Sequence, residues 1–231
     1  MMIAVAAAVL IAVLWALTAA YAGWRLGLAP QQAILYAPLK LVRRIDDGSV
    51  EVARSAEAPV IYAVSHRSLL DPTLMLSLLP GDTLHILDET AARSMWLEPW
   101  RDISRTIVFN ARHVFVSRRL VRRLRGNGRI AVYFPASIRR DTKQFRLFRA
   151  VAKIATRAEA RIVAIAVADS RGDPQSEPPY ERGALSPVVV RALAPMSVEQ
   201  LVERAGGQAG IGTALYERLM QACRGTANGT A

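Results

Sequence analysis

The first two dozen residues form an apolar segment that carries no charge. No Asp, Glu, Lys or Arg occurs from Met1 to Trp24, and 3–22 is an almost unbroken run of Ala, Val, Leu, Ile and Trp. About 20 apolar residues suffice to cross the hydrocarbon core of a bilayer as a helix. Ala20-Tyr21-Ala22 also has the small-x-small form of a signal-peptide cleavage site. No basic residue precedes the run, however, and the run is longer than a typical signal core. We therefore expect a retained transmembrane anchor over 1–24.

Basic residues follow the anchor and are absent before it. Arg25, Lys40, Arg43 and Arg44 all lie on its C-terminal side, so the positive-inside rule predicts a single-pass protein of the cytoplasmic membrane with its bulk in the cytoplasm. We expect 25–49 to be an interfacial or connecting segment. Its apolar part, 31–42, suits a place against the membrane surface or as a cap on the domain that follows.

The remaining residues, 50–231, alternate short β-like runs with segments of helical spacing. The β-like runs are 60–64, 84–87, 106–109, 130–134, 162–167 and 188–193. The helical segments are 73–79, 89–100, 116–125, 145–159 and 211–223. Strands alternating with helices predict a single layered α/β domain. The Pro-, Gly- and Ser-rich segment 170–186 predicts an exposed loop.

Charge changes this picture, because the excess of +11 is concentrated in one region. Between 101 and 149 there are fourteen Lys or Arg and two acidic residues. A basic face suits nucleic acid, anionic lipid headgroups or phosphate-bearing substrates. No nucleic-acid-binding motif accompanies it, so beside an anchor we expect lipid and phosphate as partners and no nucleic acid. A merely solvated basic face is the alternative interpretation.

Candidate chemistry lies at the end of the first predicted strand, where His66 is followed five residues later by Asp71. Five residues of continuous helix would place the two side chains on different faces, so they can meet only if His66 precedes the helix. Either Ser68 caps the helix in a capping box with Asp71, or Asp71 itself is the cap before Pro72. Asp71 could then accept the imidazole N–H and orient His66 as a general base. The alternative is an aspartate that only caps a helix and a histidine that only fills a loop.

The other candidate side chains are interpreted as structural. His85 lies inside a predicted strand, and His113 lies beside Arg112. The single cysteine, Cys223, excludes an internal disulfide and is expected to be an ordinary packed or surface thiol.

Two later segments accompany the His66–Asp71 pair, Thr-Ile-Val-Phe-Asn-Ala-Arg at 106–112 and Ile-Ala-Val-Tyr-Phe-Pro-Ala-Ser-Ile-Arg-Arg at 130–140. The ordered set resembles the glycerolipid acyltransferases of the lysophosphatidic acid acyltransferase type. Their motifs are Asn-His-x4-Asp, Phe-x-x-Arg and Phe-Pro-Glu-Gly-Thr-Arg. The matching residues are His66, Asp71, Arg112, Phe134, Pro135 and Arg139. The chain departs from the pattern at Ser65, where the family has Asn, and at Ala136, where it has Glu.

The resemblance implies an acyltransferase domain with a mixed sheet flanked by helices. It implies direct transfer of a fatty acyl group from acyl-CoA or acyl-carrier protein to the hydroxyl of a lysophospholipid or similar acceptor, in phospholipid synthesis or remodelling. His66 would be the base and Asp71 its orienting residue, with no metal or cofactor. The residues that would bind the acceptor or its phosphate are Arg112, Phe134, Pro135, Arg139 and Arg140. Because the Glu is replaced by Ala136, the alternative is a degenerate member that binds lipid or a partner enzyme without catalysis.

Overall fold

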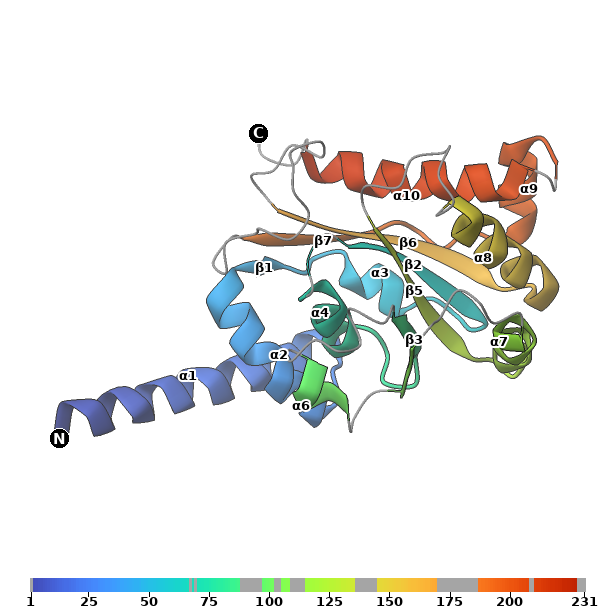
Figure 1. Ribbon diagram of the computed structural model, residues 1–231. Helices are drawn as coiled ribbons and strands as arrows, with labels where there is room; N and C mark the ends of the chain where they lie inside the picture. The colour runs from blue at the N-terminus through green and yellow to red at the C-terminus, as the bar shows by residue number, and fades with distance from the viewer. Residues whose placement is uncertain are drawn as a thin grey trace.

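A computed structural model describes residues 2–66, 68, 70–87, 97–101, 105–108, 115–135, 145–169, 187–207 and 210–227 (Figure 1). The strands are β1 (Ile45–Asp46), β2 (Val60–His66), β3 (Leu84–Leu87), β4 (Arg105–Val108), β5 (Arg129–Pro135), β6 (Arg161–Asp169) and β7 (Val188–Ala192). The helices are α1 (Met2–Leu26), α2 (Pro30–Arg43), α3 (Val50–Arg54), α4 (Asp71–Leu78), α6 (Glu98–Arg101), α7 (Phe115–Arg125), α8 (Phe145–Ala158), α9 (Val198–Ala205) and α10 (Ile211–Ala227).

The seven described strands form one mixed sheet in the order β1-β7-β6-β2-β5-β3-β4. Strands β6, β2, β5, β3 and β4 are mutually parallel, whereas β7 is antiparallel to β6 and parallel to β1. The predicted mixed α/β sheet flanked by helices is therefore confirmed.

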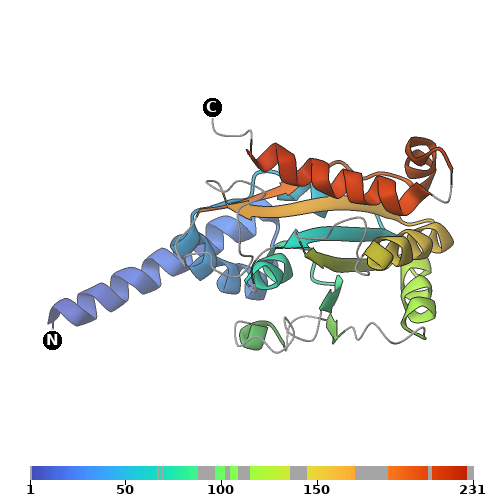
Figure 2. The ribbon, with the colours of Figure 1, turned by 45° about the horizontal axis from the view of Figure 1, so that its top comes forward.

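Alternating residues of the central strands build two hydrophobic cores, one on each face of the sheet. Tyr62 and Val64 of β2 pack with residues of α1 to α4. Ile61 and Ala63 of the same strand pack with residues of α7 to α10. Figure 2 shows α8 and α10 on one side of the sheet and α4 on the other. Both faces are covered, which explains why β2 reads as a continuous apolar run.

Helix α1 projects from the body of the protein, and most of its apolar surface is exposed (Figure 1). Only Ala19 and Ala22 of its 25 residues are buried. Its C-terminal half packs against α2, where the Trp15 indole N–H donates to the carbonyl oxygen of Ile34 at 2.7 Å. By length and composition, α1 is a helix that could cross a membrane. The predicted apolar anchor thus corresponds to a helix that could serve as one.

A charged cluster around Asp47 joins the two N-terminal helices to the edge of the sheet. The buried carboxylate accepts hydrogen bonds from the Tyr36 hydroxyl and, at 2.8 Å, from Lys40 Nζ. Arg25, at the end of α1, pairs with it at 3.3 Å. Burial alone would raise the pKa of Asp47, but these hydrogen bonds and the charges of Lys40 and Arg25 lower it. The chain turns beside this cluster, where the Gly48 N–H donates to Asp46 Oδ1 at 3.1 Å.

The predicted strands are all present within a residue or two of their expected bounds, except that residue 109 lies outside the described part. Helices α7, α8 and α10 also match their predicted segments. The segment 89–100 is described only from residue 97, and the predicted loop 170–186 lies outside the described residues. Helices α3 and α9 and the two-residue strand β1 were not predicted, and β1 already pairs with β7 before the expected domain boundary at residue 50.

Candidate active site

The two principal sequence motifs meet at the carboxyl edge of the sheet. Strands β2 and β5 are parallel neighbours whose last residues, His66 and Pro135, lie opposite each other in the register. The preceding pair is Ser65 and Phe134. Segments far apart in the sequence thus end side by side, which brings the end of the strand before Asp71 next to the Phe-Pro motif.

The order of the strands makes this edge a natural place for a ligand. From β2 the chain crosses over β5 to reach β3, with α4 on one face of the sheet. From β5 it crosses over β2 to reach β6, with α8 on the other face. The two connections therefore leave adjacent strands in opposite directions. In open α/β sheets, ligands bind outside the carboxyl ends of the strands at such a switch point.

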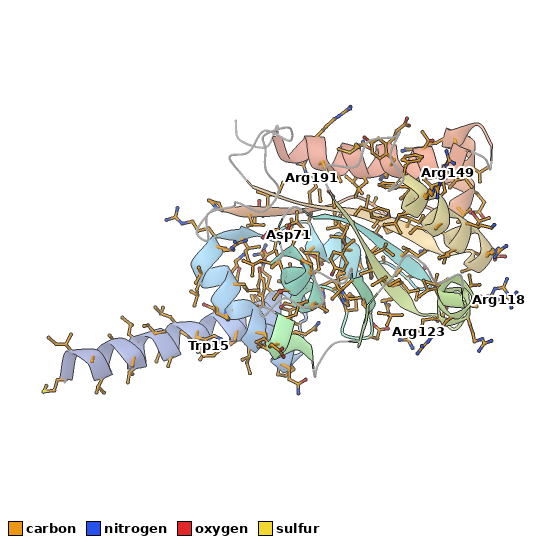
Figure 3. The ribbon with its side chains drawn as sticks, in the orientation of Figure 1. Trp15, Asp71, Arg118, Arg123, Arg149 and Arg191 are labelled. Carbon is orange, nitrogen blue, oxygen red and sulfur yellow. The ribbon has the colours of Figure 1, made fainter. Side chains whose placement is uncertain are left out.

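Asp71 is the first residue of α4, and its side chain is held by the turn that leaves β2 (Figure 3). Its Oδ2 atom accepts the backbone N–H of Ser68 at 2.9 Å, and its own N–H donates to the Ser68 carbonyl at 3.1 Å. The Ser68 hydroxyl accepts the N–H of Leu70 at 3.2 Å. Asp71 is only 1% exposed. A buried carboxylate is costly unless it is hydrogen-bonded, so this turn both buries the carboxylate and fixes its position.

Neither of the two predicted caps matches the start of α4. The bond from Ser68 N–H to the Asp71 carboxylate has the form of the reciprocal bond of a capping box, but Ser68 is not the cap residue, because α4 begins at Asp71 and its cap position is Leu70. The other half differs, because the Ser68 hydroxyl receives the N–H of Leu70 rather than that of Asp71. The alternative, Asp71 as the cap residue, is wrong, since Asp71 lies inside α4 and Leu70 precedes the helix without a side-chain cap.

His66 is the last residue of β2 rather than a loop residue. In the alternation along β2, position 66 continues the series Val60, Tyr62, Val64. That series belongs to the face of the sheet covered by α4, the helix that Asp71 begins. The side chains of His66 and Pro135 lie outside the described part of the chain, so the predicted contact between His66 and Asp71 stays a prediction.

A buried pair of polar side chains, His85 and Tyr133, lies on the same face. His85 Nδ1 and the Tyr133 hydroxyl are 2.8 Å apart, one on β3 and the other on β5. Burial lowers the pKa of His85 to about 3. Burial also raises the pKa of Tyr133, and the Asp71 carboxylate adds to that shift. Both groups are therefore neutral at physiological pH, and Tyr133 lies within the electrostatic reach of Asp71.

The burial of His85 agrees with the structural role predicted for it. Tyr133 was not predicted as part of this site. The sequence signal that could have identified Tyr133 is the alternation of side chains along β5. It puts Tyr133 on the face of the sheet covered by α4 and Phe134 on the opposite face.

Phe134 was predicted to contact substrate, and the structure places it in the core instead. Its side chain is fully buried on the face covered by α8, where it stacks on Phe148 with ring centroids 4.2 Å apart. An aromatic pair of this geometry stabilises the packing of α8 against β5. Phe134 therefore helps to fix the end of β5 by packing against α8 in the core.

The predicted anion-binding residues lie in segments that the structure does not describe. They are Arg112, Arg139 and Arg140. Ala136 also lies outside the described residues. Among the described residues, no group of three or more His, Cys, Asp or Glu side chains could hold a metal ion.

Comparison with known proteins places this fold beside an acyltransferase of known structure. No protein-family model and no curated protein sequence matches the chain. Among solved structures, the chain is similar to the 1-acyl-sn-glycerophosphate (LPA) acyltransferase PlsC from Thermotoga maritima. The TM-score is 0.56 at 13% sequence identity, and the alignment covers 92% of this chain and 90% of PlsC. The chain therefore has a PlsC-like fold over nearly its whole length.

Proposed function

We propose that this protein is a membrane-anchored O-acyltransferase that transfers a fatty acyl group to the hydroxyl of a lysophospholipid or a similar lipid acceptor. The observation that carries the proposal is the register at the carboxyl edge. It sets His66 opposite Pro135 and beside the turn that buries Asp71. The PlsC-like fold supports the same reaction class.

In the proposed mechanism, His66 acts as the general base and Asp71 orients it. The imidazole takes the proton of the acceptor hydroxyl while the hydroxyl oxygen attacks the thioester carbonyl of the donor. A C–O bond forms, the C–S bond breaks, and the leaving thiolate receives the proton from the imidazolium. A buried, hydrogen-bonded carboxylate at position 71 would hold the imidazole in one tautomer and stabilise its cation. The reaction needs no metal and no cofactor.

The donor would be acyl-CoA or acyl-carrier protein. Arg112, Arg139 and Arg140 would bind the phosphate of the acceptor, because guanidinium groups donate paired hydrogen bonds to phosphate oxygens. The exposed α1 would anchor the protein in the cytoplasmic membrane with the sheet on the cytoplasmic side, since the basic residues lie at the C-terminal end of α1 and after it.

The experiment that tests this proposal is an acceptor panel. Full-length protein in lipid nanodiscs is incubated with labelled acyl-CoA or acyl-carrier protein and a series of lysolipids, and the products are separated by chromatography. We expect an acylated product with at least one acceptor. The absence of any product with both donors, together with measurable lysolipid binding, would instead support a non-catalytic lipid-binding protein, the role that Ala136 suggests.

A further inference from the structure

Helices α7 and α8 pack side by side and expose a surface rich in positive charge. α7 has the sequence Phe-Val-Ser-Arg-Arg-Leu-Val-Arg-Arg-Leu-Arg, and α8 contains no acidic residue either. We define the α7–α8 basic face as the nine cationic side chains of the two helices: Arg118, Arg119, Arg122, Arg123, Arg125, Arg146, Arg149, Lys153 and Arg157. All are exposed except Arg123, which is partly buried. Figure 3 labels three of them, Arg118, Arg123 and Arg149.

The protein does not neutralise this charge with its own described residues. Arg123 donates to the backbone carbonyl of Asp82, and Arg125 donates to the backbone carbonyl of Arg157. A backbone carbonyl carries no net charge, so neither bond neutralises an arginine. The carboxylate of Asp82 pairs with Arg129 instead. None of the nine forms an ion pair with any side chain in the described ranges.

The arrangement costs the protein stability. Arg118 and Arg122 repel each other at i,i+4 on α7, as do Arg149 and Lys153 on α8. Arg146 lies in the first turn of α8, where the helix dipole disfavours a cation. The basic residues in the last turn of α7 and Arg157 in the last turn of α8 agree with the dipole, but Arg146 at the start of α8 has no such explanation. An external anion would offset this cost.

The basic face begins at the edge of the sheet that carries the candidate site. α8 connects β5 to β6, and both strands are parallel to β2. The helix must therefore start at the carboxyl edge and end at the amino edge. Arg146 and Arg149 lie at the end of α8 nearest to His66 and Pro135, and Arg157 lies at the far end. A partner bound along α8 would be adjacent to the site.

The face also lies away from the free part of α1. In Figures 1 and 2, α1 extends from one end of the protein and α7 and α8 lie at the other. A helix that crosses a bilayer along its normal places the opposite end of the domain in water. Surface charges act over about 8 Å at physiological salt, so lipid headgroups around α1 would not neutralise this face.

We propose that the α7–α8 basic face is a docking surface for an acidic protein that delivers the acyl group to the carboxyl edge. The inference rests on the proposed acyltransferase function and selects a protein-borne thioester over a free coenzyme thioester as the donor. Complementary charge speeds the encounter and fixes the orientation of the partner.

The test compares two donors on one charge-reversed enzyme. The double variant Arg146→Glu/Lys153→Glu changes two exposed residues on α8. Full-length protein in nanodiscs is assayed with an acidic acyl-carrier protein loaded with a labelled acyl chain, and separately with acyl-CoA. We expect kcat/KM with the carrier to fall at least about tenfold and kcat/KM with acyl-CoA to change less than about twofold. The matched control, Arg204→Glu/Arg224→Glu, makes the same charge change on α9 and α10 and should reduce carrier use less than about threefold.

Direct binding of the carrier protein, measured by fluorescence anisotropy, separates failure of this inference from failure of the proposed function. If wild-type protein transfers from neither donor but binds the carrier, and the α8 variant does not, the docking surface stands and the reaction class is wrong. An equal loss with both donors, or no effect on the carrier, would overturn the docking surface. So would loss of binding to anionic vesicles or to DNA in the α8 variant with carrier binding unchanged. The milder variant Arg146→Gln/Lys153→Gln should give an intermediate loss if the Glu variant folds poorly.

Discussion

Helices α1 and α4 are both strongly apolar, yet they lie in opposite surroundings. All eight residues of α4, including Asp71, are buried against the sheet. Only two of the 25 residues of α1 are buried, and its isoleucines, its valines and all its leucines except Leu26 are exposed. Apolar composition alone therefore does not determine where a helix lies. The difference comes from what surrounds each helix: the sheet covers α4, whereas the described part of the protein leaves most of α1 uncovered.

The largest expected effect comes from placing the same charge in each helix. Leu78 of α4 is fully buried, whereas Leu10 of α1 is 60% exposed. We expect Leu78→Asp to lower the free energy of unfolding by more than about 4 kcal/mol, because it removes core packing and buries a charge. Leu10→Asp should leave thermal unfolding in detergent unchanged and lower the fraction of protein that sediments with membranes, at a cost of about 3 kcal/mol for the inserted helix. Equal destabilisation by the two changes would contradict the comparison.

The next prediction concerns the residue that begins α4. We expect Asp71→Asn to reduce acyl transfer by about 10²- to 10⁴-fold, the range found for loss of acid–base function. Its melting temperature should fall by only a few degrees, because an amide oxygen can still accept the Ser68 N–H. Single-turnover rates together with thermal unfolding measure both quantities. Full activity in a folded Asp71→Asn protein would show that the Asp71 side chain only holds the turn before α4.

A smaller effect is expected where α1 is tied to the sheet. Asp47→Asn removes the charge that pairs with Lys40 and Arg25, and we expect a loss of about 2–3 kcal/mol in the free energy of unfolding at neutral pH. The pKa of Asp47 is lowered in the folded protein. Its contribution is therefore present above its unfolded pKa of about 3.9 and is lost as the pH falls through the folded value.

Denaturant unfolding at several pH values tests this prediction. The difference between wild type and Asp47→Asn should shrink as the solution is acidified. A difference that stays constant down to the most acidic condition would show that the charge of Asp47 does not stabilise the fold.

The smallest effect is expected beneath α4, at the His85–Tyr133 pair. Tyr133→Phe keeps the ring but leaves His85 Nδ1 without its 2.8 Å partner. We expect a loss of about 1–2 kcal/mol in the free energy of unfolding, the cost of a buried unsatisfied polar group. Chemical denaturation measures it. No change in stability would mean that the hydrogen bond contributes nothing net.

Much of the fold could be predicted from local pattern, since strands such as β3 and helices such as α8 follow hydrophobic period and turn residues. Helix α9 was missed although its signal is present: Ser197 and Gln200 form a capping box, and Gly206 ends the helix in the left-handed conformation. Strand β1 carries no local signal, because two residues become a strand only through pairing with β7.

The candidate site also has some contacts that local sequence predicts and others that it does not. Spacing predicted the Ser68–Asp71 hydrogen bond, which depends on one short turn. The resemblance predicted that the two motifs share one site, but the pairing of His66 with Pro135 was not predicted, since nothing local specifies that β5 lies beside β2. The His85–Tyr133 contact could not be predicted, because it depends on β5 lying between β2 and β3 against the order of the sequence. The core position of Phe134 follows from strand alternation, which the motif match obscured.

The most direct test of the central claim is the rate of acyl transfer by His66→Ala. Full-length wild-type and variant protein are compared in nanodiscs with the best donor and acceptor from the panel, and their melting temperatures are measured in parallel. We expect transfer to fall by at least about 10²-fold in a protein that melts as the wild type does. Equal transfer rates for the two folded proteins would contradict the assignment of the carboxyl edge of β2 and β5 as an acyltransferase site.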